Sequence, residues 1–127
     1  MSNGAKQILF VDDEGEVRFT ASRFFKQHGY KVSTAENADE ALRVADGVPL
    51  QAIVLDVNLA GENGLELMTF LKHNHPGVPI ILYTGMVHDD ETIKKLLSQG
   101  AHRYMVKGAS LEELLKVVQG AVEAKDK

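Results

Sequence analysis

Three acidic residues, one threonine and one lysine stand directly after short apolar runs of the sequence. Asp12 and Asp13 follow the first such run, and Asp56, Thr84 and Lys107 follow three later runs. A carboxylate can attack phosphorus as a nucleophile and form an aspartyl phosphate. A hydroxyl and an ammonium group can donate hydrogen bonds to phosphoryl oxygens. These residue types therefore indicate phosphoryl-transfer chemistry, provided that the fold brings them together.

The acidic residues in this set also predict a site for a hard cation. Two carboxylates about 4 Å apart repel each other by about 4 kcal/mol at an effective dielectric near 20, so three together are unfavourable unless a cation joins them. Oxygen ligands without Cys or His suit Mg²⁺, which commonly takes one or two carboxylates together with phosphate oxygens. We therefore expect Mg²⁺ near Asp12, Asp13 and Asp56.

The apolar runs have the length and the β-branched content of buried strands. The segment 30–35 alternates more than the others, which indicates a strand nearer an edge of the sheet. Strands are predicted at residues 8–11, 30–35, 52–55, 80–83 and 104–106.

Between these strands, apolar residues recur at helical spacing, and capping residues and glycines mark where each helix begins and ends. Strict alternation of five strands and five helices implies an α/β fold, a parallel sheet with helices on both faces. Ligands bind such sheets beyond the carboxyl ends of the strands, so the five residues named first should meet at one rim. Predicted helix starts are Asn37, Asn63, Asp89 and Ser110, and predicted stops are Gly29, Gly47 and Gly100.

The composition argues against several other classes of protein. The 127 residues suit a single domain, and 44% hydrophobic with 25% charged residues is ordinary for a globular protein. The absence of cysteine removes disulfides and thiolate sites, and the net charge of −4 disfavours direct nucleic-acid contact. No apolar run approaches the roughly 20 residues needed to span a bilayer. We therefore expect one cytoplasmic domain over residues 1–127, without membrane insertion and with no output domain in this chain.

Taken together, the order and spacing of these residues resemble the receiver domain of two-component response regulators. The resemblance covers essentially the whole chain and implies a doubly wound, flavodoxin-like sheet with strand order 2-1-3-4-5. It also implies a phosphoacceptor switch rather than an enzyme, with self-catalysed, Mg²⁺-dependent phosphotransfer and autodephosphorylation. The matching residues are Asp12-Asp13, Asp56, Gly64, Thr84-Gly85, Gly100-Ala101, Tyr104 and Lys107.

The resemblance assigns a role to each site residue. Asp56 would accept the phosphoryl group from a histidine kinase or a phosphotransfer protein. Asp13 and Asp56 would ligate Mg²⁺ directly together with the backbone carbonyl of Asn58, and Asp12 would act mainly through metal-bound water.

The same resemblance implies how the signal would leave the site. Lys107 would pair with the phosphoryl oxygens, Thr84 would move to hydrogen-bond them, and Tyr104 would change rotamer with it. A downstream protein would then bind the face formed by the fourth helix, the fifth strand and the fifth helix. Phe19 lies opposite the apolar stripe of the first helix, so it should be exposed and is a candidate anchor for the phosphodonor.

Two positions depart from the pattern of that family. Gly108 and Ala60 stand where prolines are usual. A cis peptide before a non-proline residue costs roughly 2.5–4 kcal/mol, so the bond between Lys107 and Gly108 should be trans. Because glycine also leaves the loop more freedom, we expect Lys107 to be less pre-organised before phosphorylation than in a receiver with proline at position 108.

Three other functions compete with this interpretation. A phosphatase of the haloacid dehalogenase type would need a second Asp two residues after Asp56, where this chain has Asn58. A nucleotide-binding module would need a Gly-rich loop after the first strand, where this chain has three acidic residues. The alternative that remains open is a receiver fold used as a scaffold or interaction module, with little phosphorylation.

Overall fold

The computed structural model describes residues 6–59, 61–85 and 89–125. Within these residues, five parallel strands form one sheet in the order β2-β1-β3-β4-β5, as predicted. The strands are β1 (Lys6–Val11), β2 (Tyr30–Ala35), β3 (Ala52–Leu55), β4 (Ile80–Thr84) and β5 (Arg103–Val106). The helices are α1 (Gly15–Gln27), α2 (Ala38–Gly47), α3 (Gly64–Asn74), α4 (Asp90–Ser98) and α5 (Leu111–Lys125).

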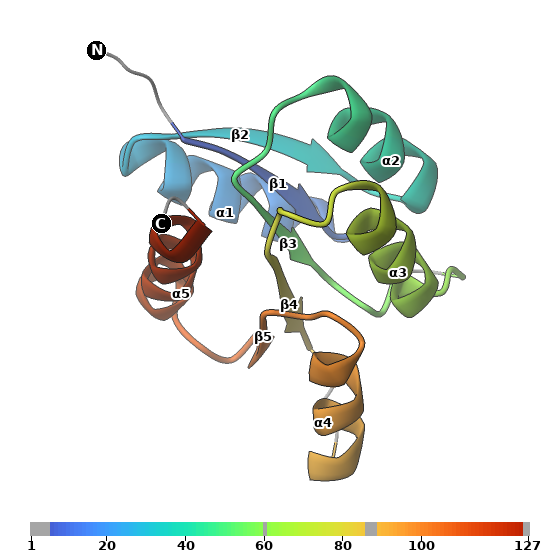
Figure 1. Cartoon of the computed structure of the whole chain (residues 1–127). Coiled ribbons are helices and arrows are strands. Elements are labelled where there is room, and N and C mark those ends of the chain that lie inside the picture. Colours follow the sequence, from blue (N-terminus) through green and yellow to red (C-terminus); the bar gives the residue numbers. More distant parts are fainter. Residues whose placement is uncertain (1–5, 60, 86–88, 126–127) are drawn as a thin grey trace.

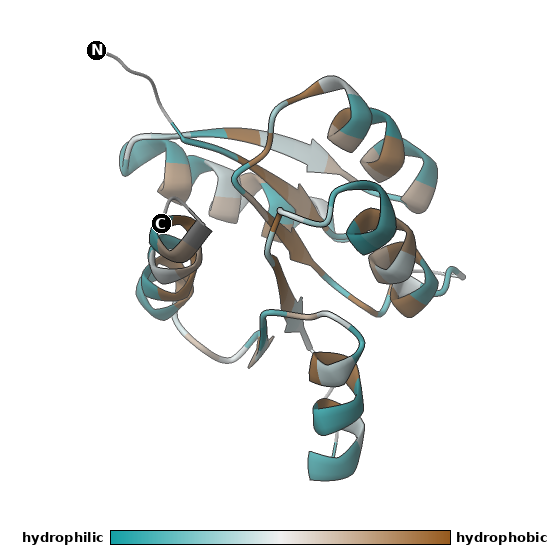
Figure 2. Ribbon diagram, viewed as in Figure 1, coloured by the Kyte–Doolittle hydropathy of each residue, from teal (hydrophilic) through white to brown (hydrophobic). Residues whose placement is uncertain are grey.

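The alternation of side chains along the strands produces two separate hydrophobic cores. In β1, Leu9 and Val11 point to one face of the sheet, while Ile8 and Phe10 point to the other. Figure 1 shows α2 and α3 on the first face and α1 and α5 on the second. Figure 2 shows the central strands as mostly hydrophobic, with hydrophilic residues along the helices that surround them. The two-sided burial explains why the central strands are continuous apolar runs.

The position of β2 at one edge of the sheet agrees with its alternating sequence. Its middle residues are only half-buried or exposed, whereas all four residues of β3 are buried. An edge strand pairs with a neighbouring strand on one side only, so its side chains are less completely buried than those of a central strand.

Four of the helices begin at the predicted capping residues. The side chains of Asn37 and Asp89 accept hydrogen bonds from backbone N–H groups in the first turns of α2 and α4. Asn63 accepts from two backbone N–H groups of α3, at 3.0 and 3.2 Å. The hydroxyl of Ser110 accepts from the backbone N–H of Glu113 at 3.1 Å. These bonds satisfy backbone donors that a helix start otherwise leaves unpaired.

Phe19 is exposed on α1, as the helical spacing predicts. Its exposed fraction is 67%, whereas Ala21 and Phe25 of the same helix are fully buried. Among the described residues, no helix combines the length and the apolar character needed to cross a membrane.

Candidate functional site

The residues singled out in the sequence lie at the carboxyl ends of four strands. Asp12 directly follows β1, Asp56 follows β3, Thr84 is the last residue of β4, and Lys107 follows β5. Because all four strands run in parallel, their carboxyl ends meet at one rim of the sheet. The fold therefore brings together residues that are up to 95 positions apart in the sequence.

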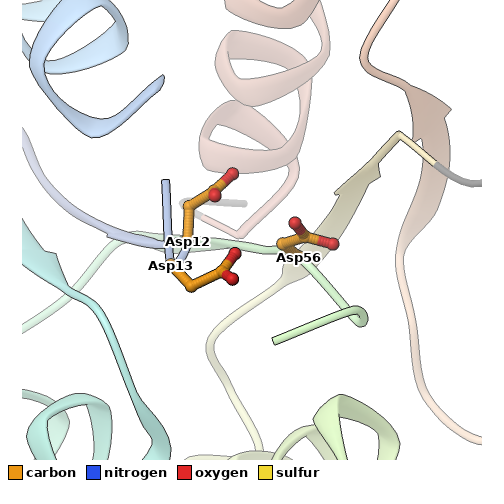
Figure 3. Close-up of side chains that lie close together, drawn as sticks. All are labelled: Asp12, Asp13 and Asp56. Atoms are coloured by element: carbon orange, nitrogen blue, oxygen red, sulfur yellow. The ribbon is translucent and has the colours of Figure 1, made fainter. Parts of the chain in front are cut away.

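Three carboxylates form a cluster at this rim. Oxygen atoms of Asp12, Asp13 and Asp56 lie within 4.8 Å of one another. Figure 3 shows the pair at the end of β1 next to the single aspartate from β3. Asp12 and Asp56 are almost completely buried and Asp13 is half-buried. A cluster of hard oxygen donors with this spacing fits a divalent cation.

Lys107 supplies a positive charge to this cluster. Its Nζ lies 2.8 Å from Asp12 Oδ2 and 2.9 Å from Asp56 Oδ2. It lies 2.8 Å from Glu14 Oε1 as well. The ammonium group therefore offsets part of the repulsion that three neighbouring carboxylates would otherwise create.

The contacts of Lys107 count against the expectation that it is less pre-organised than in a receiver with proline at position 108. Its ammonium group already contacts the carboxylate of Asp56 and two other carboxylates. The expectation of a trans bond before Gly108 is confirmed, because no cis peptide occurs in the part of the chain that the structure describes. The prediction counted only the freedom that glycine gives the loop and left out the acceptors that fix the far end of the side chain.

Backbone contacts also hold the loop that carries Lys107. The backbone N–H of Lys107 donates to the carbonyl of Thr84 at 2.8 Å, which extends the pairing of β4 with β5. The buried hydroxyl of Tyr83 lies 3.4 Å from the Lys107 carbonyl and 3.3 Å from the Ala109 carbonyl, to which it can donate in turn. Tyr83 thus helps to fix the loop where the usual proline is missing. Ala60, the other departure from the family pattern, lies outside the described residues.

The electrostatics of the site favour a charged Lys107. Burial works to lower the pKa of Lys107, but hydrogen bonds to Asp12, Glu14 and Asp56 outweigh it and raise that pKa well above its ordinary value. Burial raises the pKa of the Asp12 carboxyl, against the opposing effect of its hydrogen bond from Lys107. The ionised form of Asp12 is therefore held at some cost, which a further cation would reduce.

The loop after β3 fixes the orientation of Asp56. The backbone N–H of Asn58 donates to Asp56 Oδ1 at 2.9 Å, and Oδ2 accepts from Lys107. At Gly64, which begins α3, a Cβ atom would overlap the backbone of Val57. The start of α3 packs so closely against this loop that a residue with a Cβ atom would not fit at position 64.

The two predicted switch residues lie on neighbouring strands. Thr84 is completely buried and pairs in register with Val106, and the half-buried Tyr104 pairs with Leu82. Leu82 and Thr84 are two residues apart, so their side chains share one face of the sheet with Tyr104.

Sequence reasoning missed two residues of the site, Glu14 and Tyr83. Glu14 stands directly after the acidic pair, so its position was a usable signal. Tyr83 had no such signal, because an aromatic residue inside an apolar run is typical of any buried strand. The site opens to solvent as a hollow of about 530 Å³. It is lined by Asp13, Glu14, Asp56, Asn58, Gly85 and Lys107.

Comparison with known protein families gives one match that covers most of the chain. The sequence model described as "Response regulator receiver domain" matches residues 8–119. That range includes all the residues of the rim.

Individual relatives agree with this match. The nitrogen assimilation regulatory protein NtrX of Azorhizobium caulinodans is 32% identical over 122 residues, which cover 94% of this chain and 26% of NtrX. The chain thus spans about a quarter of the length of the first curated relatives that it matches.

Solved structures show the same fold. A response regulator receiver domain protein from Methanospirillum hungatei superimposes with a TM-score of 0.89 at 24% identity, covering 97% of this chain and 98% of that one. A response regulator from Burkholderia pseudomallei is 31% identical, with a TM-score of 0.84 and coverage of 95% of this chain and 71% of that one. The Burkholderia structure contains a phosphorylated aspartic acid, a calcium ion and citrate.

Proposed function

The chain belongs to the receiver domain family of response regulators, the phosphoacceptor switches of two-component signalling, and we propose that Asp56 is its phosphoacceptor. One observation carries this assignment. At the rim, the Asp56 carboxylate lies next to the acidic pair after β1 and 2.9 Å from the ammonium group of Lys107. The phosphorylated aspartic acid and the calcium ion of the Burkholderia relative support the same chemistry.

In the proposed transfer, a carboxylate oxygen of Asp56 attacks the phosphorus of a phosphohistidine. The new P–O bond forms as the P–N bond breaks, and the electron pair of that bond stays on the imidazole nitrogen of the donor. Lys107 already contacts Asp56, so it is placed to donate to an oxygen of the incoming phosphoryl group. In autodephosphorylation, a water oxygen attacks the same phosphorus as the bond between phosphorus and the Asp56 oxygen breaks, which restores the carboxylate and releases inorganic phosphate.

We propose that Mg²⁺ binds at the acidic cluster. Asp13 and Asp56 would ligate it directly with the backbone carbonyl of Asn58, and Asp12 would act through water. When bound, the ion supplies positive charge that offsets both the carboxylates and the phosphoryl oxygens.

Mg²⁺ is expected to stabilise the folded chain. The unfolded chain has no such cluster, so the ion binds the native state selectively, and the free energy of unfolding should rise by about 2.7 kcal/mol at 100 times the dissociation constant. Thermal melts with and without Mg²⁺ measure this shift. An equal shift in the Asp13→Ala variant would show that the ion does not bind at the proposed site.

Phosphorylation would be read out through Thr84 and Tyr104. We propose that Thr84 moves to hydrogen-bond the phosphoryl group and that Tyr104 changes rotamer, because the two residues lie on one face of adjacent strands. The change would alter the face formed by α4, β5 and α5, where a downstream protein would bind. The proposal includes no direct contact with nucleic acid. It places the chain in the cytoplasm.

The phosphodonor is proposed to be a histidine kinase or a phosphotransfer protein that contacts α1. Phe19 is exposed on that helix and lines a hollow of about 760 Å³ together with Arg23 and Lys26. An aromatic side chain flanked by basic groups is a suitable anchor for a protein partner.

Phe19→Ala should slow phosphoryl transfer from the cognate protein donor about tenfold and leave the reaction with acetyl phosphate unchanged. Truncating an aromatic anchor of an interface costs more than about 1 kcal/mol of binding free energy, and about 1.4 kcal/mol corresponds to a factor of ten. Phe70→Ala is the matched control, because Phe70 is an exposed aromatic on α3. Equal losses in both reactions would show that Phe19 acts on folding instead.

The scaffold alternative predicts little phosphorylation of any kind. Incubation with acetyl phosphate and Mg²⁺, followed by intact mass measurement, separates the two functions. The proposed function requires the mass to rise by one phosphoryl group.

A further inference from the structure

The side chain of Glu14 does not cap the helix that it precedes. Glu14 is the N-cap residue of α1, yet its side chain makes no capping hydrogen bond. Its Oε1 instead lies 2.8 Å from the Nζ of Lys107, and the residue lines the hollow beside Asp56. The Glu14 carboxylate therefore belongs to the site by contact, not to the helix start.

The contact with Glu14 engages the ammonium group of Lys107, which the proposed phosphoryl transfer needs. An ammonium group has three N–H donors, and in this structure Lys107 faces one carboxylate for each: Asp12, Glu14 and Asp56. A phosphoryl group on Asp56 requires at least one of these donors. Two of the acceptors are almost completely buried, whereas the side chain of Glu14 is 62% exposed. Glu14 is thus the partner that can leave, because its carboxylate regains water when it does so.

We propose that Glu14 is a positioning residue that restrains phosphorylation by competing with the phosphoryl group for Lys107. This inference rests on the proposed function of Asp56 as the phosphoacceptor. Glu14 holds the ammonium group in the unphosphorylated chain and adds a negative charge at the mouth of the hollow through which an anionic donor must approach. Both effects oppose the reaction.

Glu14→Gln is expected to accelerate phosphorylation by acetyl phosphate about three- to tenfold at low ionic strength. Glutamine keeps the size of the side chain and removes the charge that attracts Lys107 and repels the donor. The ratio of the variant rate to the wild-type rate should fall toward one as salt is added, because exposed charges are screened over about 10 Å at 0.1 M ionic strength. A purely structural role would not produce this salt dependence.

The experiment compares the wild type, Glu14→Gln and Glu16→Gln at a Mg²⁺ concentration that saturates each protein. Glu16 is exposed in the first turn of α1, so its replacement makes the same change of charge two residues away. Initial rates of phosphorylation are measured by intact mass at low and at high salt, and thermal melts check that each variant is folded. The proposal predicts faster, salt-sensitive phosphorylation in Glu14→Gln alone.

The other outcomes overturn the inference in distinguishable ways. Equal rates in the wild type and Glu14→Gln overturn it and leave the function of Asp56 intact. The same acceleration in Glu16→Gln shows a general effect of surface charge and overturns it as well. No phosphorylation of any of the three proteins overturns the proposed function together with the role of Glu14.

Discussion

Replacing Lys107 with methionine is expected to tighten Mg²⁺ binding about tenfold and to slow phosphorylation about a hundredfold. The first change follows because the ammonium group and the ion compete for the same carboxylates, two of which lie within 2.9 Å of Nζ. The second follows because the variant loses the charged donor that pairs with the phosphoryl oxygens. Methionine preserves an unbranched side chain of similar length, so the packing of the loop changes little.

The two expected effects have opposite signs, so misfolding of the variant cannot explain both. A misfolded variant would lose both Mg²⁺ affinity and reactivity, whereas the site predicts a gain in one and a loss in the other. Mg²⁺ titrations and rates with acetyl phosphate measure the two quantities. Lys116→Met is a suitable control, because Lys116 is exposed on α5 and should change neither. Unchanged Mg²⁺ affinity in Lys107→Met would mean that the ion binds elsewhere.

The strands were predictable because burial on both faces leaves a strong apolar signal in the sequence. The bounds of β2 and β3 agree with the predicted segments 30–35 and 52–55. β1 begins earlier than predicted, at Lys6, because its backbone already pairs with β2, with Lys6 opposite Tyr30, before the apolar run begins. Pairing of the backbone does not depend on side-chain polarity, so hydrophobic patterns miss such ends.

The convergence of the acidic residues was also predictable, because parallel strands place their carboxyl ends at one rim. The contacts that the side chains make within the rim were not predictable. The sequence shows that Lys107 follows a strand, but not that Asp12, Glu14 and Asp56 surround its ammonium group. Those contacts depend on rotamers and on the relative heights of the loops, which no residue pattern records.

The loop after β5 shows the same limit in another way. Glycine at position 108 indicates freedom when it is considered alone, yet the loop is tied to β4 through the carbonyl of Thr84 and the hydroxyl of Tyr83. The local propensity of one residue is a weak guide where contacts from a neighbouring strand decide the conformation.

Asp56→Asn is expected to abolish phosphorylation, because the amide lacks the nucleophilic carboxylate oxygen that forms the acyl phosphate. The amide keeps the shape of the side chain and one oxygen that can accept a hydrogen bond. Asp39→Asn, an identical change at an exposed position on α2, should leave the reaction intact.

The measurement that tests the phosphoacceptor most directly is the intact mass of the wild type and of Asp56→Asn after incubation with acetyl phosphate and Mg²⁺. The wild type should gain one phosphoryl group that chelation of Mg²⁺ prevents, and Asp56→Asn should gain none. A phosphoryl group on Asp56→Asn, or none on the folded wild type with Mg²⁺ bound, would contradict the assignment of Asp56.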